Sequence, residues 1–207
     1  NTLFSQKSFA FDDIDDYIDC GTGLGDSLGT YTGDLSVSLW FKSNDTGTSQ
    51  GFFNLGSFAS SQGEVKINMA SNLIYISTAN LGYWTRFSFT DTTSWHNLLV
   101  VYEAGVGHVM YLDGVSQSLT TSGSIGSSLS LTGLKTIIAG TFSTTYLFNG
   151  KMDDVAIWNT IIDANTAASI YNVGEPNSLL LAASYTNGGG TDKSGDLQGY
   201  WRMGEDA

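Results

Sequence analysis

The chain has 207 residues, with 20 acidic against eight basic side chains and a formal net charge of −12. Because phosphate groups are bound by clustered Lys and Arg side chains, this balance argues against nucleic acid and anionic membrane surfaces as partners. No apolar run approaches the roughly 20 residues that span a bilayer, so membrane insertion is not expected. The length suits one β-sandwich, and residues 1–207 are interpreted as a single domain.

Ser, Thr and Gly are abundant, and only 14% of the residues are charged. This balance suits a β-protein with Gly-built turns and a hydroxyl-rich surface. Such surfaces are common in secreted and virion-exposed proteins, so we expect an extracellular or virion-surface location. The single cysteine, Cys20, rules out an intrachain disulfide framework and is interpreted as a buried structural thiol.

Short strands bounded by turn residues are predicted along most of the chain. Residues 34–42 alternate cleanly, with four apolar side chains on one face and Trp40 among Ser and Lys side chains on the other. An Asp113-Gly114 turn reverses the chain after a strong hairpin. The predicted strands cover residues 9–11, 17–18, 34–42, 52–55, 64–70, 73–77, 83–89, 95–102, 108–112, 115–119, 135–140 and 197–203, with one more inside 148–159.

One short helix near the C-terminus is expected. Asp163 can cap residues 164–171 by accepting hydrogen bonds from exposed amides, and Gly174 marks the end of the helix. Residues 20–34 are predicted to be a surface loop, because they are rich in Gly and poor in apolar side chains. The pattern therefore indicates an all-β fold, a two-sheet antiparallel jelly-roll sandwich, rather than βαβ units.

Two distant acidic stretches, FAFDDIDDYIDCG at residues 9–21 and FNGKMDDVAIWN at residues 148–159, are predicted to lie side by side. Alternation places Asp153 on the face of Val155 and Ile157, so its carboxylate must meet backbone donors, a cation or water. Calcium takes about six to eight oxygen ligands, so a site drawn from both stretches is a candidate. The candidate ligands are Asp12, Asp13, Asp16, Asp153 and Asp154, with Asp12 and Asp153 favoured. The alternative is that these side chains only cap turns.

Exposed aromatic rings beside polar groups suit a sugar-binding surface. Trp84 and Arg86 share one face of their predicted strand. If the strands of Trp40 and Trp84 lie in one sheet, the two rings form a platform with Tyr83 and Tyr146 near its loops. The alternative is that Trp40 is buried under a neighbouring segment and that Trp84 merely covers the sheet.

Four other side chains are interpreted as structural. Trp95 and Trp158 adjoin long apolar runs and are expected to pack. His96 and His108 are isolated and lack zinc-ligand spacing.

The order of these segments resembles the laminin G-like jelly rolls of the concanavalin A-like lectin/glucanase superfamily. The matching pieces within residues 9–174 are FDDIDDYID, LSVSLWFK, WHNLLVVYE with YLDG, FNGKMDDVAIWN, and a helix ending IYNVG. The resemblance implies two curved sheets, with ligands met at loops or on the concave sheet. It also implies a structural calcium between the first and last strands in many members.

One segment departs from the family pattern. Many such domains carry an L-x-G-Y-W strand near the N-terminus, whereas here LQGYWRMGE closes the chain at residues 197–205. This segment either pairs at a sheet edge within the domain or begins a following repeat.

Catalysis is not expected. Laminarinases of the superfamily carry an E-x-D-x-x-E strand, and none of the four glutamates here has that spacing. The sequence therefore predicts a non-catalytic recognition or adhesion module that binds a glycan or cell-surface polysaccharide. The alternative is a structural fibre or capsid-decoration module that binds a protein partner.

Overall fold

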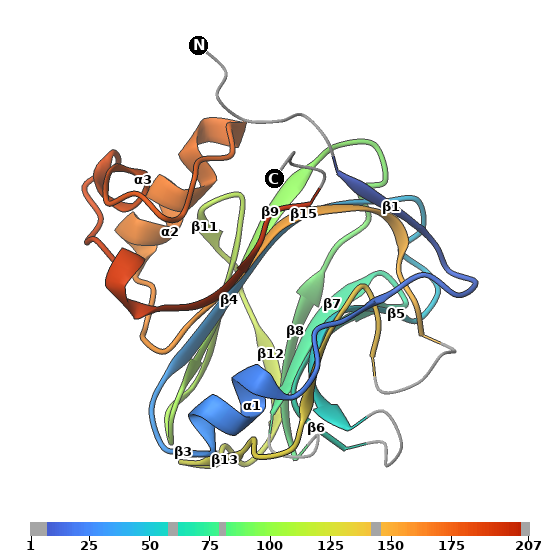
Figure 1. Cartoon of the computed structure of the whole chain (residues 1–207). Coiled ribbons are helices and arrows are strands. Elements are labelled where there is room, and N and C mark those ends of the chain that lie inside the picture. The colour runs from blue at the N-terminus through green and yellow to red at the C-terminus, as the bar shows by residue number, and fades with distance from the viewer. Residues whose placement is uncertain (1–7, 58–61, 79–81, 142–145, 204–207) are drawn as a thin grey trace.

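A computed structural model describes residues 8–57, 62–78, 82–141 and 146–203 as two antiparallel sheets packed face to face (Figure 1). Sheet A has the strand order β1, β15, β4, β9, β10, β11, and β16 also pairs with β15. Sheet B has the strand order β12, β8, β7, β6, β5, β14, β2. The predicted two-sheet antiparallel sandwich is therefore confirmed.

The strands of sheet A are β1 (Phe9–Asp12), β4 (Leu35–Ser43), β9 (His96–Glu103), β10 (Gly107–Leu112), β11 (Val115–Ser116), β15 (Asn149–Trp158) and β16 (Leu197–Trp201). The strands of sheet B are β2 (Ile18–Asp19), β5 (Gln50–Ser57), β6 (Gln62–Ala70), β7 (Leu73–Thr78), β8 (Tyr83–Ser88), β12 (Thr120–Gly123) and β14 (Lys135–Ile138). A small separate pair joins β3 (Thr30–Tyr31) and β13 (Leu129–Ser130). The described helices are α1 (Gly23–Leu28), α2 (Ala164–Tyr171) and α3 (Ala183–Thr186), and 3₁₀ turns cover Asn172–Gly174 and Ser194–Asp196.

The hydrophobic core lies between the two sheets and follows strand alternation. Leu39 and Phe41 of β4 point into it, as do Ile74 and Ile76 of β7, and all four are almost fully buried. Burying each such side chain stabilises the fold by about 1.5–3 kcal/mol. Cys20 packs at the margin of this core, where burial raises the pKa of its thiol to about 11, as expected for an unreactive structural cysteine.

The outer face of sheet A is also buried, under a helical cap formed by α2, α3 and residues 172–182. Val101 and Trp158 of sheet A form a second apolar cluster with Ile170 of α2 and Tyr185 of α3. The Trp158 indole Nε1 donates to the Tyr185 hydroxyl oxygen at 3.1 Å. Figure 1 shows α2 and α3 on the side of sheet A that faces away from sheet B.

The predicted helix is confirmed, and two short helices were missed. The Asp163 side chain accepts from the Thr166 amide at 2.8 Å, as the capping pattern predicts. Helix α1 lies in the predicted loop at residues 20–34, and α3 lies between the predicted helix and the last predicted strand, where no element was expected. In α1, a Cβ on Gly25 would come within 2.6 Å of two backbone carbonyl oxygens, so this glycine serves close packing and not flexibility.

The two acidic stretches are confirmed as neighbours along one edge of β15. β1 pairs with β15 from Phe9 opposite Met152 to Asp12 opposite Asn149. Farther along the same edge, β16 pairs with β15, with Val155 opposite Trp201. The LQGYW segment therefore closes a sheet edge within this sandwich, whereas Gly204 and Glu205 lie outside the described residues.

The two histidines occupy opposite electrostatic environments. His108 is buried between the sheets, with Thr78 Oγ1 at 3.1 Å from Nε2 and Thr85 Oγ1 at 3.2 Å from Nδ1. Burial lowers the pKa of His108 to about 3. His96 lies 2.7 Å from Asp113 and 3.2 Å from Asp91, and the hydrogen bond to Asp113 is the main cause that raises its pKa.

These shifts predict opposite effects of pH on stability. His108 stays neutral in the folded chain, while the unfolded chain takes up a proton below about pH 6.5, so its contribution to stability falls between about pH 6.5 and pH 3. The raised pKa of His96 gives stability that is complete below about pH 6.5 and is lost as pH rises through the folded value. Proton NMR should show His96 titrating above pH 6.5 and His108 unchanged from pH 8 to pH 4, with His96→Gln to assign the signals. Two imidazoles that both titrate near pH 6.5 would contradict the buried geometry.

Candidate functional site

The outward side of sheet B carries aromatic and polar side chains from neighbouring strands. In β8, Thr85 and Phe87 are buried against the core, so alternation turns Trp84 and Arg86 outward. Cross-strand partners share a face. The pairing of β7 with β8 therefore places Ser77 beside Trp84 and Tyr75 beside Arg86.

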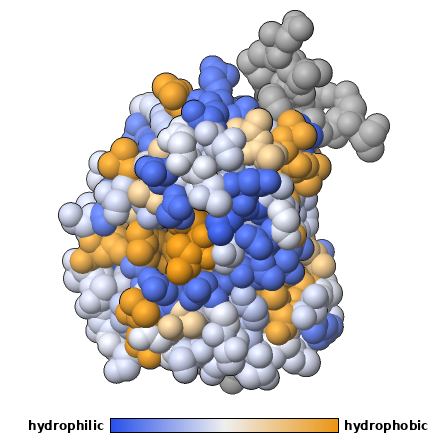
Figure 2. Space-filling view, turned by 90° about the vertical axis from the view of Figure 1, so that its left-hand side faces the viewer, coloured by the Kyte–Doolittle hydropathy of each residue, from blue (hydrophilic) through white to orange (hydrophobic). Residues whose placement is uncertain are grey.

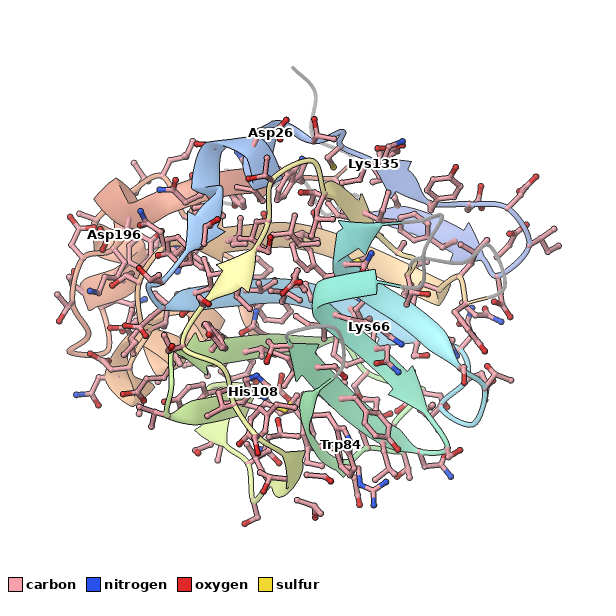
Figure 3. All side chains as sticks on the ribbon, turned by 90° about the horizontal axis from the view of Figure 1, so that it is seen from below. Asp26, Lys66, Trp84, His108, Lys135 and Asp196 are labelled. Atoms are coloured by element: carbon pink, nitrogen blue, oxygen red, sulfur yellow. The ribbon has the colours of Figure 1, made fainter. Side chains whose placement is uncertain are left out.

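We name this side of sheet B the open face, and its register arranges it in two transverse rows. The first row is Ser122, Trp84, Ser77, Lys66 and Asn54, and the second is Thr120, Arg86, Tyr75, Asn68 and Gly51. Neighbours in a row lie on adjacent strands about 4.8 Å apart, and the two rows are about 7 Å apart along the strands. Figure 3, which views the molecule from below, labels Trp84 and Lys66 on the strands of this sheet.

The Arg86 guanidinium lies against two aromatic rings. Its carbon Cζ is 4.9 Å from the centroid of the Trp84 ring and 5.7 Å from that of Tyr75. Its Nη1 donates to the Tyr75 hydroxyl oxygen at 3.1 Å, and the two rings meet edge-on at 6.1 Å. Each cation–π contact is worth about 0.5–1 kcal/mol at a partly exposed site. The three half-buried side chains therefore hold one another in a fixed arrangement.

The polar side chains of the open face are largely desolvated. Ser77 is buried, and Lys66 and Asn68 are half-buried. Burial lowers the pKa of Lys66, because the charged ammonium is the form that loses hydration. Glu64, at a register shift of the same strand, is also buried, and desolvation raises its pKa although a backbone hydrogen bond from Ser130 lowers it.

Asn54 is the most unusual residue of the open face. It is fully buried, yet neither the amide nitrogen nor the amide oxygen of its side chain has a hydrogen-bond partner. It lies opposite Lys66 of β6 and Ile137 of β14, so it faces outward and not into the core. A buried amide without partners costs about 1–3 kcal/mol for each unpaired group. The Asn54 side chain therefore lowers the stability of the folded chain.

The predicted role of Trp40 in a shared platform is wrong. Strand β4 belongs to sheet A, whereas β8 belongs to sheet B, so Trp40 and Trp84 lie on different sheets. Trp40 is only 5% exposed and stacks on Tyr171 of α2 at 5.8 Å with an interplanar angle of 24°. The serine companions of Trp40, Ser36 and Ser38, are buried too, and Ser36 donates to the Thr160 carbonyl oxygen at 2.7 Å. The structure therefore agrees with the alternative interpretation, in which Trp40 is buried under a neighbouring segment.

The other two predicted aromatic residues, Tyr83 and Tyr146, lie in different environments. Tyr83 follows the inward parity of Thr85, and its ring centroid lies 4.7 Å from that of His108, so it is not part of the open face. Tyr146 is 39% exposed, and its carbonyl oxygen accepts from Gly51 at the far end of the second row. Of the five predicted ligand residues, Trp84 and Arg86 alone stand together.

Five residues near the centre of the open face were among those that the sequence analysis missed. They are Tyr75, Ser77, Lys66, Asn68 and Asn54. The signal for two of them was present, because residues 73–77 and 83–89 were predicted as consecutive strands joined by a short turn. An antiparallel register between those strands sets Tyr75 opposite Arg86.

The calcium site that joins Asp12 to Asp153 is wrong. Asp12 pairs with Asn149, four residues before Asp153 and therefore about 13 Å away along the strand. Asp153 Oδ1 accepts from the amides of Asp154 and Met203. Asp154 Oδ1 accepts from the Tyr200 hydroxyl at 2.6 Å. These two carboxylates thus accept hydrogen bonds within the protein and stabilise the pairing of β16 with β15.

A bulge explains why strict alternation misplaced Asp153. Met152 and Val155 both face the core although they are three residues apart, and the pairing with β4 shifts between Asp153 and Ala156. Asp154 has a φ of 45°, the left-handed conformation that such a bulge uses.

A different acidic group forms at the N-terminal end. Asp12, Asp15 and Asp16 are exposed, and one carboxylate oxygen of each lies within 4.8 Å of the others. Asp13 does not belong to this group. Its amide donates to the Phe148 carbonyl oxygen, and burial, together with the charges of Asp45 and Asp12, raises the pKa of its carboxyl.

Two antiparallel sheets, one capped by helices and the other presenting an aromatic, cationic and amide surface, define a lectin-like jelly-roll sandwich. A laminin G-like family model described as the concanavalin A-like lectin/glucanases superfamily matches residues 12–168. The chain belongs to this superfamily. No curated protein matches it.

Solved structures share the fold at low sequence identity. The carbohydrate-binding module CBM40 of a Ruminococcus gnavus IT-sialidase, bound to alpha2,3 sialyllactose, has a TM-score of 0.64 at 9% identity, covering 80% of this chain and 97% of that one. Domain 4 of the extracellular arabinanase AbnA from Geobacillus stearothermophilus, in complex with arabinotriose, has a TM-score of 0.58 at 16% identity, covering 83% and 78%. A heptameric SAP-like pentraxin from Limulus polyphemus has a TM-score of 0.54 at 14% identity, covering 70% and 73%.

The unpaired amide of Asn54 predicts a stabilising substitution. Asn54→Leu keeps the branched shape and replaces two unpaired polar groups by methyl groups, so we expect the free energy of unfolding to rise by about 1–3 kcal/mol. Asn97→Leu is the matched control, because the buried Asn97 side chain donates to Ser38 Oγ at 3.1 Å and its loss leaves that hydroxyl unpaired. Denaturant unfolding should show opposite signs for the two variants. A destabilised Asn54→Leu variant would mean that the amide is satisfied, for instance by water.

Proposed function

We propose that this chain is a non-catalytic glycan-binding module that acts through the open face. The observation that carries the proposal is the half-exposed group of Trp84, Arg86 and Tyr75, because an indole face beside fixed hydrogen-bond donors suits a sugar ring with its hydroxyls. Ser77, Asn68 and Lys66 extend this surface with further polar groups. The similar folds of the sialidase module bound to sialyllactose and of the arabinanase domain in complex with arabinotriose support this assignment.

The arrangement of carboxylates supports a non-catalytic role. Glycoside hydrolysis uses two carboxyl groups about 5–9.5 Å apart. Among the described residues of sheet B, the carboxylates are those of Glu64 and Asp19, and their strands β6 and β2 are three strands apart, about 14 Å. Asp19 is also paired with Lys135 at 2.6 Å. We infer that the open face holds a glycan without cleaving it.

An extracellular or virion-surface location fits this function, because glycans are displayed there. No helix among the described residues is long and apolar enough to span a membrane. The glycan partner is thus proposed to be a cell-surface or extracellular polysaccharide.

Calcium remains part of the proposal, at a different place from the one that the sequence favoured. Asp12, Asp15 and Asp16 fit the ion, because ligand oxygens about 2.3–2.6 Å from one calcium stand within about 5 Å of each other. Their oxygens meet that limit, and their exposure leaves room for the waters that would complete the shell. Bound calcium would neutralise these charges and stabilise the turn between β1 and β2.

A second candidate function, a structural module that packs on a protein partner, has one observation in its favour. The helical cap exposes Val173, Leu180 and Leu181, which are 90%, 63% and 56% exposed. Figure 2, which faces this side of the molecule, shows an apolar patch bordered by hydrophilic side chains. The open face, with its ordered polar and aromatic groups, favours the glycan.

Calcium removal should lower stability if the acidic group binds the ion. A ligand at 100 times its Kd stabilises the folded state by about 2.7 kcal/mol, so chelation should lower the Tm by several degrees. The double variant Asp15→Asn, Asp16→Asn should abolish this shift, and Asp192→Asn, which removes an exposed carboxylate elsewhere, should retain it. An equal Tm with calcium and with chelator would remove the ion from the proposal.

Glycan binding should depend on Trp84. Trp84→Ala is expected to weaken binding about tenfold to a hundredfold, measured by calorimetry on a hit from a glycan array, because a central aromatic anchor is lost. Trp95→Ala is the matched control, since Trp95 is 39% exposed and directly precedes β9 of sheet A. Both variants should keep the circular dichroism spectrum of the parent, and the glycan should be recovered uncut. Unchanged binding by folded Trp84→Ala would take the open face out of the proposal.

A further inference from the structure

The charge on the open face points to the chemistry of its ligand. Arg86 lies in a chain with 20 acidic residues, yet its contacts are the rings of Trp84 and Tyr75 and the Tyr75 hydroxyl. By contrast, Lys135, Lys193 and Arg202 each lie within 4.0 Å of an aspartate carboxylate. In the described part of the chain, no carboxylate is paired with Arg86.

The stacking also leaves hydrogen-bond donors available. A guanidinium has five N–H donors, and the contact with Tyr75 uses one nitrogen, Nη1. The ring contacts fix the plane of the guanidinium without consuming its remaining donors. A planar fork held in this way matches the two oxygens of a carboxylate or of a sulfate ester.

A second cation lies on the same face. Lys66 belongs to the first row, two strands from Trp84 and therefore about 10 Å away along the row. Tyr75 and Ser77 of β7 lie between the strands that carry these two basic side chains. The carboxylate of Asp19, beyond Asn54 and Ile137 at the edge of the sheet, is paired with Lys135. Arg86 and Lys66 thus place two basic side chains on the open face of an acidic molecule.

We propose that the ligand is an anionic glycan, whose carboxylate or sulfate group is bound by Arg86 while a sugar ring stacks on Trp84. This proposal rests on the proposed function, because it concerns the same surface. It is narrower, because a neutral glycan on the open face would satisfy that function and not this inference.

The first experiment uses the unmodified protein and paired probes. Calorimetry compares trigalacturonate with its methyl ester, and a sulfated galactose disaccharide with its unsulfated parent, so that each pair differs only in charge. A charge-assisted bond predicts about tenfold to a hundredfold tighter binding of the charged member of at least one pair. The pair that responds distinguishes carboxylate from sulfate.

The second experiment assigns the effect to Arg86. Arg86→Gln should lower the affinity for the charged probe to that for its neutral partner, and Arg86→Lys should recover only part of it, because lysine keeps the charge without the planar fork. Lys151→Gln is the matched control, since Lys151 is exposed on sheet A and its loss changes the net charge equally.

The outcomes separate the two proposals. Equal binding of charged and neutral partners overturns the anionic ligand and leaves glycan binding intact. Binding to none of these probes, nor to any glycan on an array, overturns both. Selectivity for the charged member that survives in Arg86→Gln also overturns the assignment to Arg86.

Discussion

The packing of the helical cap on sheet A decides which surface of the sandwich can meet a ligand. Trp158 and Tyr185 are joined by a hydrogen bond in a fully buried cluster, and Trp40 stacks on Tyr171. These contacts bury both faces of β4, β9 and the second half of β15, including serine side chains that alternation would place in water. The outward side of sheet B keeps its aromatic and cationic groups half-buried instead. The cap therefore leaves the outward side of sheet B as the proposed recognition surface.

Most of the fold could be predicted from the sequence, because the dominant signal is local. Alternation in residues 34–42 and 73–77, turns such as Asp113-Gly114, and the Asp163 cap each depend on neighbours in the chain. The prediction of a loop at residues 20–34 failed because it used only the local sequence. Gly25 and its neighbours suggested a loop, although the missing Cβ is what allows α1 to approach two carbonyl oxygens.

The site was only half predictable, because alternation assigns a side chain to one face of a strand and not to a sheet. Trp40 and Trp84 both have outward parity, yet one meets a helix from the end of the chain and the other does not. The sequence also predicted that β1 and β15 are adjacent, but it did not predict the register of their pairing. The bulge at Asp154 adds one residue to β15, and a shift of one residue exchanges its two faces.

The contrast between a net charge of −12 and a basic position on the open face has a kinetic consequence. At physiological ionic strength charges are screened beyond about 8 Å, so the acidic surface neither attracts nor strongly repels an approaching glycan. Arg86 acts only at contact, where two rings have already fixed its plane and partly removed its water. Discrimination at this face would then appear in the dissociation rate rather than the association rate. The proposed anionic glycan would then be selected by slow release, because its charge contacts Arg86 while its sugar ring stacks on Trp84.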